Sequence, residues 1–129
     1  MIMITGGAFQ GKTKFAESHF GLKKDDVING EVCGFDDVFS AKCIINYHIF
    51  IKRLIENNID PLEYTQKICV ENPEVIIIIN EIGCGIIPIE KSDRIWREQT
   101  GRAGCIIAER SSAVIRVSCG IPTVIKGSL

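Results

Sequence analysis

A short stretch near the start of the chain combines glycines, a lysine and a hydroxyl side chain at a characteristic spacing. The apolar run Ile2–Thr5 leads into Gly6, and Gly11, Lys12 and Thr13 follow after four further residues. This Gly-x-x-x-x-Gly-Lys-Thr spacing, between an expected strand and an expected helix, is the P-loop pattern. It predicts a phosphate-binding loop made of Gly6, Gly7, Ala8, Phe9, Gln10, Gly11, Lys12 and Thr13.

Each fixed position of this loop has a chemical reason. Gly6 and Gly11 allow the backbone to curl until successive N–H groups point at phosphate oxygens. The helix that follows directs its positive end at the same anion. Lys12 is expected to reach the β- and γ-phosphates, and the Thr13 hydroxyl to coordinate Mg²⁺. An ordinary glycine-rich turn is the alternative, but the complete pattern favours a site for ATP or GTP with Mg²⁺.

A carboxylate follows the most apolar run of the chain. Val75–Ile79 contains one valine and four isoleucines, which is typical of a central parallel strand, and Asn80 and Glu81 come next. The carboxyl ends of such strands are where open α/β sheets bind ligands. Glu81 is therefore predicted to hold Mg²⁺ through a water, or to orient or deprotonate the attacking nucleophile. The alternative is a carboxylate that caps nearby backbone, but the P-loop favours the functional role. Gly83 and Gly85 are expected to permit a tight, mobile loop over the phosphates.

These patterns predict Lys12 and Glu81 as catalytic residues and Thr13 and Glu81 as metal ligands. The elements that must position them alternate along the chain, which indicates a three-layer α/β fold with a mostly parallel sheet and a C-terminal hairpin. The expected strands are Ile2–Thr5, Val27–Cys33, Val75–Ile79, Ala113–Ser118 and Thr123–Lys126, with a turn at Cys119–Pro122. The expected helices run to about Phe20, over Ala41–Asn57, from the Asp60 cap to Asn72, and from Ser92 to about Arg110.

The composition indicates a single-domain protein without a nucleic-acid-binding surface or a membrane span. The 129 residues, 46% of them hydrophobic and 24% charged, are expected to form one domain over residues 1–129. A net charge of -1 indicates no basic surface for nucleic acid. No apolar run reaches the roughly 18 residues of a membrane span, and no signal peptide is recognisable, so a cytoplasmic protein is expected. The six cysteines lack C-x-x-C spacing, which favours free thiols over a zinc site.

Four blocks of residues occur in an order that is typical of one enzyme family. They are Thr5-Gly6-Gly7-Ala8 with Gly11-Lys12-Thr13; Asn80-Glu81-Ile82-Gly83-x-Gly85-Ile86-Ile87-Pro88; Arg97-Glu98-x-x-Gly101-Arg102; and Val117-Ser118-x-Gly120-Ile121-Pro122 with Lys126. In these blocks the chain resembles the bifunctional adenosylcobinamide kinase / adenosylcobinamide-phosphate guanylyltransferase of cobalamin assembly. The second block is far more specific than the P-loop, which is generic by itself.

The resemblance implies a RecA-like P-loop fold, nucleotide sites near subunit contacts and a homo-oligomer, with a trimer expected. It also implies two reactions on a corrinoid substrate. The first is phosphorylation of the aminopropanol hydroxyl of adenosylcobinamide by ATP or GTP. The second is transfer of GMP to the resulting phosphate through a covalent guanylyl-histidine.

The chain departs from that family in its length. The shortfall follows the P-loop helix, where the family carries its guanylylated histidine, and neither His19 nor His48 aligns with that residue. Both lie on helical faces, so His19 is expected to be packed or half-exposed and His48 to be a hydrogen-bonded core or interface residue, with catalysis the less favoured role for each. A covalent intermediate requires its nucleophile, whereas phosphoryl transfer depends mainly on positioning and electrostatics. The sequence therefore predicts nucleotide binding and kinase chemistry, with guanylyl transfer lost or greatly reduced.

Two arginines also match family positions, Arg97 and Arg102. The planar donor fork of arginine suits phosphate, so Arg102 is predicted to contact the nucleotide, with a surface salt bridge as the alternative. Shortly after it, Gly104 and Cys105 stand where the family has Asn-Gln. Two other functions stay open, a paralogue acting on another small alcohol or phosphate and a nucleotide-binding regulatory or assembly module. The P-loop and Glu81 favour an enzyme over such a module.

Overall fold

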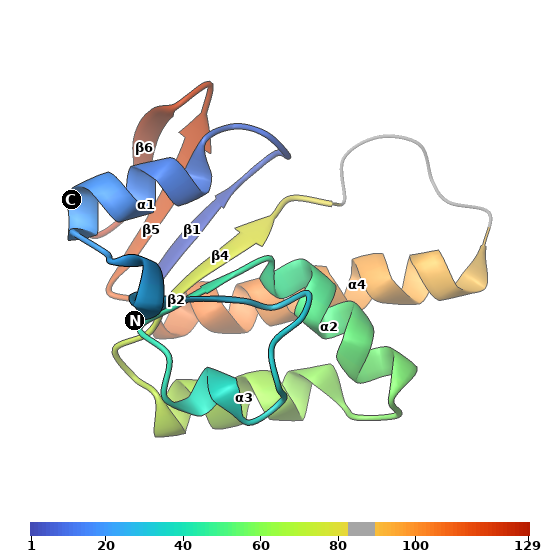
Figure 1. The fold of residues 1–129 in the computed structure, drawn as a ribbon. Coiled ribbons are helices and arrows are strands. Elements are labelled where there is room, and N and C mark those ends of the chain that lie inside the picture. The colour runs from blue at the N-terminus through green and yellow to red at the C-terminus, as the bar shows by residue number, and fades with distance from the viewer. Residues whose placement is uncertain (83–89) are drawn as a thin grey trace.

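The protein is built on a sheet with its first strand in the middle (Figure 1). In this computed structural model, residues 1–82 and 90–129 are described, and their strands form one sheet in the order β2-β3-β4-β1-β5-β6. β1 to β5 run parallel, and β6 is antiparallel to β5. The strands are β1 Ile2–Gly6, β2 Val27–Asn29, β3 Cys43–Ile45, β4 Ile76–Asn80, β5 Ala113–Ser118 and β6 Ile121–Lys126.

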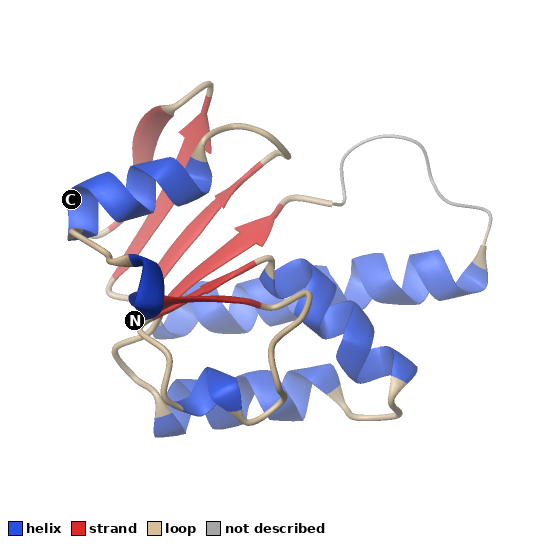
Figure 2. Ribbon diagram, viewed as in Figure 1, coloured by secondary structure: helices blue, strands red, loops and turns tan. Residues whose placement is uncertain are grey.

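Helices cover both faces of this sheet (Figure 2). α1 packs on one face through Ala16, and the other three helices pack on the opposite face. The predicted α/β fold with a mostly parallel sheet and a C-terminal hairpin is therefore confirmed. The helices are α1 Lys12–Phe20, α2 Tyr47–Glu56, α3 Pro61–Glu71 and α4 Lys91–Arg110.

The isoleucine run explains why β4 is central. Ile76 and Ile78 pack with Ile4 in the core on the α1 side, whereas Ile77 and Ile79 pack in the core on the α2–α4 side. Because side chains of a strand alternate between faces, only a strand covered on both sides has this continuous apolar pattern. β1 and β4 pair in register from Ile2 opposite Ile76 to Gly6 opposite Asn80, so their carboxyl ends finish together.

Two helix boundaries lie where the sequence indicates them. Asp60 caps α3, because its Oδ1 accepts hydrogen bonds from the backbone N–H groups of Leu62 and Glu63 at 2.9 and 3.3 Å, with Pro61 in the first turn. Gly21 ends α1 in a left-handed conformation at φ 62°. α4 begins one residue before the expected Ser92, with Glu90 at its cap position.

The helix predicted over Ala41–Asn57 is wrong in its first part. Cys43–Ile45 forms β3 between β2 and β4, and α2 begins only at Tyr47. Asn46 separates the two elements with φ 56°, a left-handed conformation that asparagine adopts more easily than most residues. The buried Ile44 fits a helical spacing with Ile51, although it reaches the same core from a strand.

Two further expectations are also corrected. β2 stops at Asn29 instead of Cys33, because the backbone turns there and the N–H groups of Val32 and Cys33 donate to the Asn29 carbonyl. The hairpin turn is confined to Cys119 and Gly120, both with positive φ, as two-residue hairpin loops favour. The tight loop predicted at Gly83 and Gly85 lies outside the described residues. Within the described part of the chain, no helix is long and apolar enough to span a membrane.

Candidate functional site

The loop between β1 and α1 has the curled backbone that the P-loop pattern predicts. Gly6 has φ 147°, Phe9 has φ 60°, and Gly11 has φ 86° at the N-cap of α1. Gly6 also lies against β5, where a Cβ atom at this position would be 2.4 Å from the Val117 carbonyl oxygen. A side chain at Gly6 is therefore excluded both by its φ and by the neighbouring strand.

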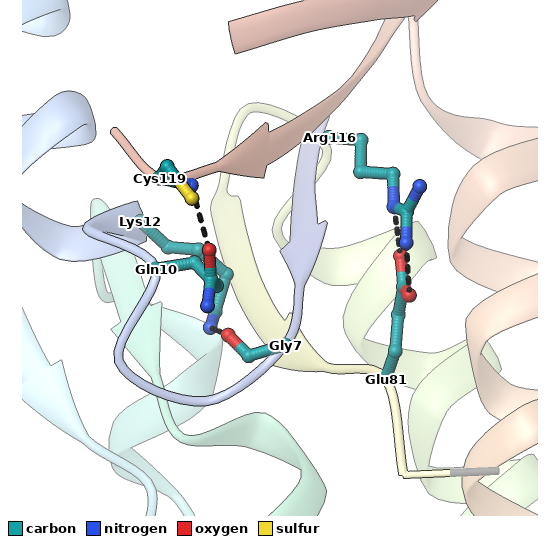
Figure 3. A network of polar contacts seen from close by, with 6 residues as sticks. All are labelled: Gly7, Gln10, Lys12, Glu81, Arg116 and Cys119. Atoms are coloured by element: carbon teal, nitrogen blue, oxygen red, sulfur yellow. Dashed lines mark hydrogen bonds and ion pairs between the residues drawn. The ribbon is translucent and has the colours of Figure 1, made fainter. Parts of the chain in front are cut away.

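Lys12 carries a positive charge into a mostly buried position at the start of α1. The residue is only 7% exposed, and its Nζ donates a hydrogen bond of 2.6 Å to the carbonyl oxygen of Gly7 (Figure 3). Burial lowers the pKa of Lys12, and the nearby carboxylate of Glu81 partly offsets this by raising it. A desolvated ammonium gains most from an anionic partner, so this environment fits a bound phosphate.

A cavity of about 340 Å³ opens at this loop. The P-loop lines it from Ala8 to Thr13, and Asn46, Ile78 and Asn80 complete the wall. We call this space the P-loop cavity. It brings together Lys12, the Thr13 residue predicted to bind Mg²⁺, and two asparagines that sequence analysis did not nominate.

The turn between β5 and β6 braces the P-loop. Gln10 Oε1 accepts a hydrogen bond of 2.6 Å from the backbone N–H of Cys119 (Figure 3), and the Gln10 carbonyl accepts one of 2.8 Å from the N–H of Gly120. Gly11 also approaches this turn, because a Cβ atom there would be 3.4 Å from the Gly120 Cα atom. Gln10 thus fixes the loop to a hairpin that lies far away in the sequence.

Glu81 is held by an arginine that no sequence motif contains. Its Oε1 accepts from Arg116 Nε at 2.8 Å and its Oε2 from Arg116 Nη2 at 3.1 Å, a two-bond contact of the planar fork (Figure 3). The Glu81 N–H donates to the Gly6 carbonyl oxygen at 2.9 Å, which ties the end of β4 to β1. Arg116 is opposite Thr5 in the β1–β5 register, so only knowledge of the strand order places it near Glu81.

Asn80 lines two cavities, whereas Glu81 lines only one of them. Asn80 is part of the P-loop cavity together with Ile78, and it also borders a second cavity that is lined by Ile79 and Glu81. Because side chains alternate along an extended chain, Ile79 and Glu81 point to the same side. The predicted metal role of Glu81 stays a prediction.

The second cavity has a volume of about 280 Å³ and lies between the sheet and α4. Met3 and Thr5 of β1 form one wall, and α4 forms the other. We call it the α4 cavity. Arg97 is part of its lining and donates from Nε to the Ile82 carbonyl oxygen at 2.7 Å. The two cavities share Asn80, so they flank the carboxyl end of β4.

His48 is a buried, hydrogen-bonded residue, as its favoured interpretation describes. Its Nδ1 accepts from the Asn80 N–H at 3.1 Å, and its carbonyl oxygen accepts from Trp96 Nε1 at 2.7 Å. Burial, with a smaller effect of the Lys12 charge, lowers the pKa of His48 to about 4. His19, in contrast, lies on the exposed side of α1 and stacks on the ring of Phe15.

Arg102 lies apart from both cavities. It is exposed on α4 and donates to Glu98 Oε1 at 2.8 Å, an ion pair between successive turns of the helix. This geometry is that of the surface salt bridge kept as the alternative. Its predicted contact with the nucleotide stays a prediction.

The chain matches a known family over most of the sheet and the helices. A model of the cobinamide kinase / cobinamide phosphate guanyltransferase family matches residues 42–125 of the 129 residues. The chain belongs to this family. The matched range begins after the P-loop and includes Glu81, Arg97 and Arg116. A search among curated proteins gave no match. The resemblance found from sequence blocks is therefore confirmed, and the fold is that of a shortened P-loop member of the cobinamide kinase family.

Proposed function

We propose that this protein is a kinase that transfers the γ-phosphoryl group of ATP or GTP to the hydroxyl of adenosylcobinamide or a closely related corrinoid. The observation that supports this most strongly is the buried Lys12 ammonium in the wall of the P-loop cavity. Such a cation, at the N-terminus of a helix, attracts a polyanion. The family description supports the corrinoid as acceptor.

Different groups of the P-loop bind different parts of the triphosphate in this proposal. Backbone N–H groups of the loop and of the first turn of α1 bind phosphate oxygens, and Lys12 exchanges the Gly7 carbonyl for the β- and γ-phosphates. Mg²⁺ entering with the triphosphate would neutralise part of its charge, and the residues Thr13, Asn46 and Asn80, which carry side-chain oxygens, line the cavity that would hold it. These groups hold the γ-phosphate at the carboxyl end of β4.

Glu81 acts on the acceptor. Its carboxylate orients the acceptor hydroxyl and takes its proton as the oxygen–phosphorus bond forms and the bond to the β-phosphate oxygen breaks. The products are a phosphate ester and a nucleoside diphosphate. Arg116 positions the carboxylate through its two hydrogen bonds.

Guanylyl transfer is lost or greatly reduced in this proposal. The Nδ1 atom of His48 already accepts a hydrogen bond from Asn80, and His48 is 5% exposed. His19 lies in the last turn of α1, at the opposite end of this helix from the P-loop. A histidine nucleophile must reach the α-phosphate with a free nitrogen, and the burial of His48 and the position of His19 argue against this role.

The protein is further proposed to act as one domain over residues 1–129, in the cytoplasm, as a homo-oligomer, with a trimer expected. Support for self-association comes from the apolar side chains that the last strand leaves exposed. Ile121 is 67% exposed and Ile125 is 59% exposed on β6, the edge strand of the sheet. Unpaired edges of this kind favour contacts with another chain.

The deciding experiment measures consumption of ATP and of GTP with and without adenosylcobinamide. We expect consumption that depends on the corrinoid, a phosphorylated corrinoid product, and a loss of about 100-fold or more in kcat for Glu81→Gln with nucleotide affinity retained. Glu98→Gln on the exposed side of α4 is the matched control. Binding of both nucleotides without consumption of either would instead indicate a regulatory module. A stable label from GTP on His19 or His48 would contradict the loss of guanylyl transfer.

A further inference from the structure

The α4 cavity has features of a second ligand site. It lies beside the P-loop cavity, with Asn80 in both walls and the proposed catalytic carboxylate of Glu81 in its own wall. Most of its surface is apolar and comes from residues such as Met3 and Ile79, with a few polar groups among them. Small-molecule sites commonly have this composition.

Thr100 of α4 brings an unsatisfied hydroxyl to this cavity. The residue is 3% exposed, lines the cavity, and its Oγ1 has no hydrogen-bond partner among the residues that the structure describes. The comparison with similar residues is informative. Thr65 Oγ1 donates to the Pro61 carbonyl at 2.7 Å, and Ser111 Oγ donates to the Ile107 carbonyl at 2.6 Å, each four residues back.

Thr100 does not make that bond, and a buried hydroxyl without a partner is unfavourable. A 120° rotation about χ1 moves the hydroxyl to another staggered position, and threonine populates two such rotamers in helices. The side chain can therefore present its hydroxyl to a ligand in the cavity. A ligand that hydrogen-bonds there satisfies a group that the protein itself leaves unsatisfied.

Two glycines of α4 lie in the wall of the α4 cavity. A Cβ atom at Gly104 would have as its nearest contact the Met3 Cε atom at 3.6 Å, and a Cβ atom at Gly101 would have no atom within 4 Å. A larger side chain at Gly104 would therefore extend towards Met3 and occupy part of this cavity.

We propose that the α4 cavity binds the short, neutral, hydroxyl-bearing arm of the phosphoryl acceptor, with the Thr100 hydroxyl as a hydrogen-bonding partner. This inference rests on the proposed kinase function. A volume of about 280 Å³ accommodates an arm of a few carbon atoms, so the bulky part of the acceptor stays outside. The arm packs on Met3 and Ile79, and its reacting hydroxyl faces Glu81.

The first test locates the ligand without requiring turnover. The chain contains two methionines, and they provide a probe and its control. Met3 lines the α4 cavity, whereas Met1 contacts Cys69 and lines neither cavity. With methyl-labelled methionine, we expect adenosylcobinamide, and at higher concentration N-acetyl-1-amino-2-propanol, to shift the Met3 methyl resonance in NMR spectra and to leave the Met1 resonance unchanged.

The second test separates ligand binding from stability. Thr100→Val removes the hydroxyl at nearly constant volume, so we expect affinity for adenosylcobinamide to fall by up to about tenfold while thermal stability is unchanged or increased. Gly104→Leu fills the cavity and should weaken the corrinoid by more than about tenfold. Gly104→Ala adds only one methyl group at the same position and is the control for the stabilisation that any helix gains when it loses a glycine. Affinities for ATP and GTP should be unchanged in all three variants.

The outcomes distinguish this proposal from the kinase proposal. Corrinoid binding that is equal in wild type, Thr100→Val and Gly104→Leu would overturn the cavity assignment and leave the kinase activity standing. Corrinoid binding that these variants weaken, in a protein that consumes no nucleotide, would support the cavity and overturn the kinase. If the wild type binds neither probe, both proposals are wrong.

Discussion

Lys12 shows how one buried cation can favour the binding of an anionic phosphate group. Its ammonium is nearly buried and is satisfied by a carbonyl of its own loop, an arrangement that a phosphate can replace. We predict that Lys12→Met lowers the affinity for ATP and GTP by about 10- to 100-fold, because a charged hydrogen-bond donor is lost from a desolvated site. Isothermal titration measures this directly.

Lys14 provides the matched control for this substitution. It lies on the same helix, two residues later, and is exposed. Lys14→Met should leave both affinities within about twofold, as expected for an exposed charge. Equal losses in the two variants would indicate general electrostatic attraction in place of a defined contact.

The residues of the candidate site differ in how far they can be predicted from sequence. Gly6 to Thr13 are consecutive in the sequence, so they lie together in the structure and can be recognised from their spacing alone. Arg116 could not be predicted, because its contact depends on the strand order. β5 lies beside β1, and from β5 the Arg116 side chain reaches Glu81 at the end of β4. Asn46 enters the P-loop cavity from the β3–α2 junction, an element boundary that helical periodicity obscures.

At the scale of elements, the contact between β1 and β5 leaves no room for a side chain at Gly6. A Cβ atom there would be 2.4 Å from the Val117 carbonyl oxygen, and the residue has φ 147°. We predict that Gly6→Ala lowers the free energy of unfolding by about 3 kcal/mol or more, because backbone on both strands must move. Urea denaturation followed by circular dichroism measures this loss.

Gly101→Ala is the opposite case in the same experiment. Gly101 lies within α4 with open space around its Cα atom, so alanine is expected to raise the free energy of unfolding by about 0.5–1 kcal/mol. Destabilisation of similar size in both variants would show that the β1–β5 contact is not the cause.

The error at β3 shows that a short strand directly before a helix is hard to recognise from the sequence. The spacing of Ile44 and Ile51 suits a helix, yet a three-residue strand delivers Ile44 to the same core. A run this short carries too few residues for a period of 2 to be distinguished from one of 3.6. β4 was predicted correctly because its isoleucines are buried on both faces, a pattern that depends little on the exact boundaries.

At the scale of the whole molecule, His48 links three elements and makes stability depend on pH. Its ring accepts from β4, its carbonyl accepts from Trp96 of α4, and it belongs to α2. Its pKa falls from 6.5 to about 4 on folding, so between these values the unfolded chain binds more protons than the folded one. The stability that neutral His48 provides is complete above pH 6.5 and decreases as the pH falls towards 4.

We predict that the free energy of unfolding of the wild type, measured by urea denaturation, decreases between pH 6.5 and 4, with a slope of at most about 1.4 kcal/mol per pH unit for this one proton. His48→Asn keeps an acceptor for the Asn80 N–H and removes the titration, so its profile should be flatter in this range. His19→Asn changes an exposed histidine and should retain the wild-type slope. A wild-type slope in His48→Asn would assign the effect to other groups.

The central place of β1 in the sheet has a consequence for the order in which the protein is synthesised. β1 is translated before the other described strands, but its two neighbours, β4 and β5, come much later. The Gln10 side chain meets the Cys119 backbone across 109 positions of sequence. Such non-local pairing is slow to form. Until β4 and β5 have been synthesised, the P-loop therefore lacks its neighbouring strands, and bound nucleotide can stabilise this fold only when the β5–β6 hairpin has joined the sheet.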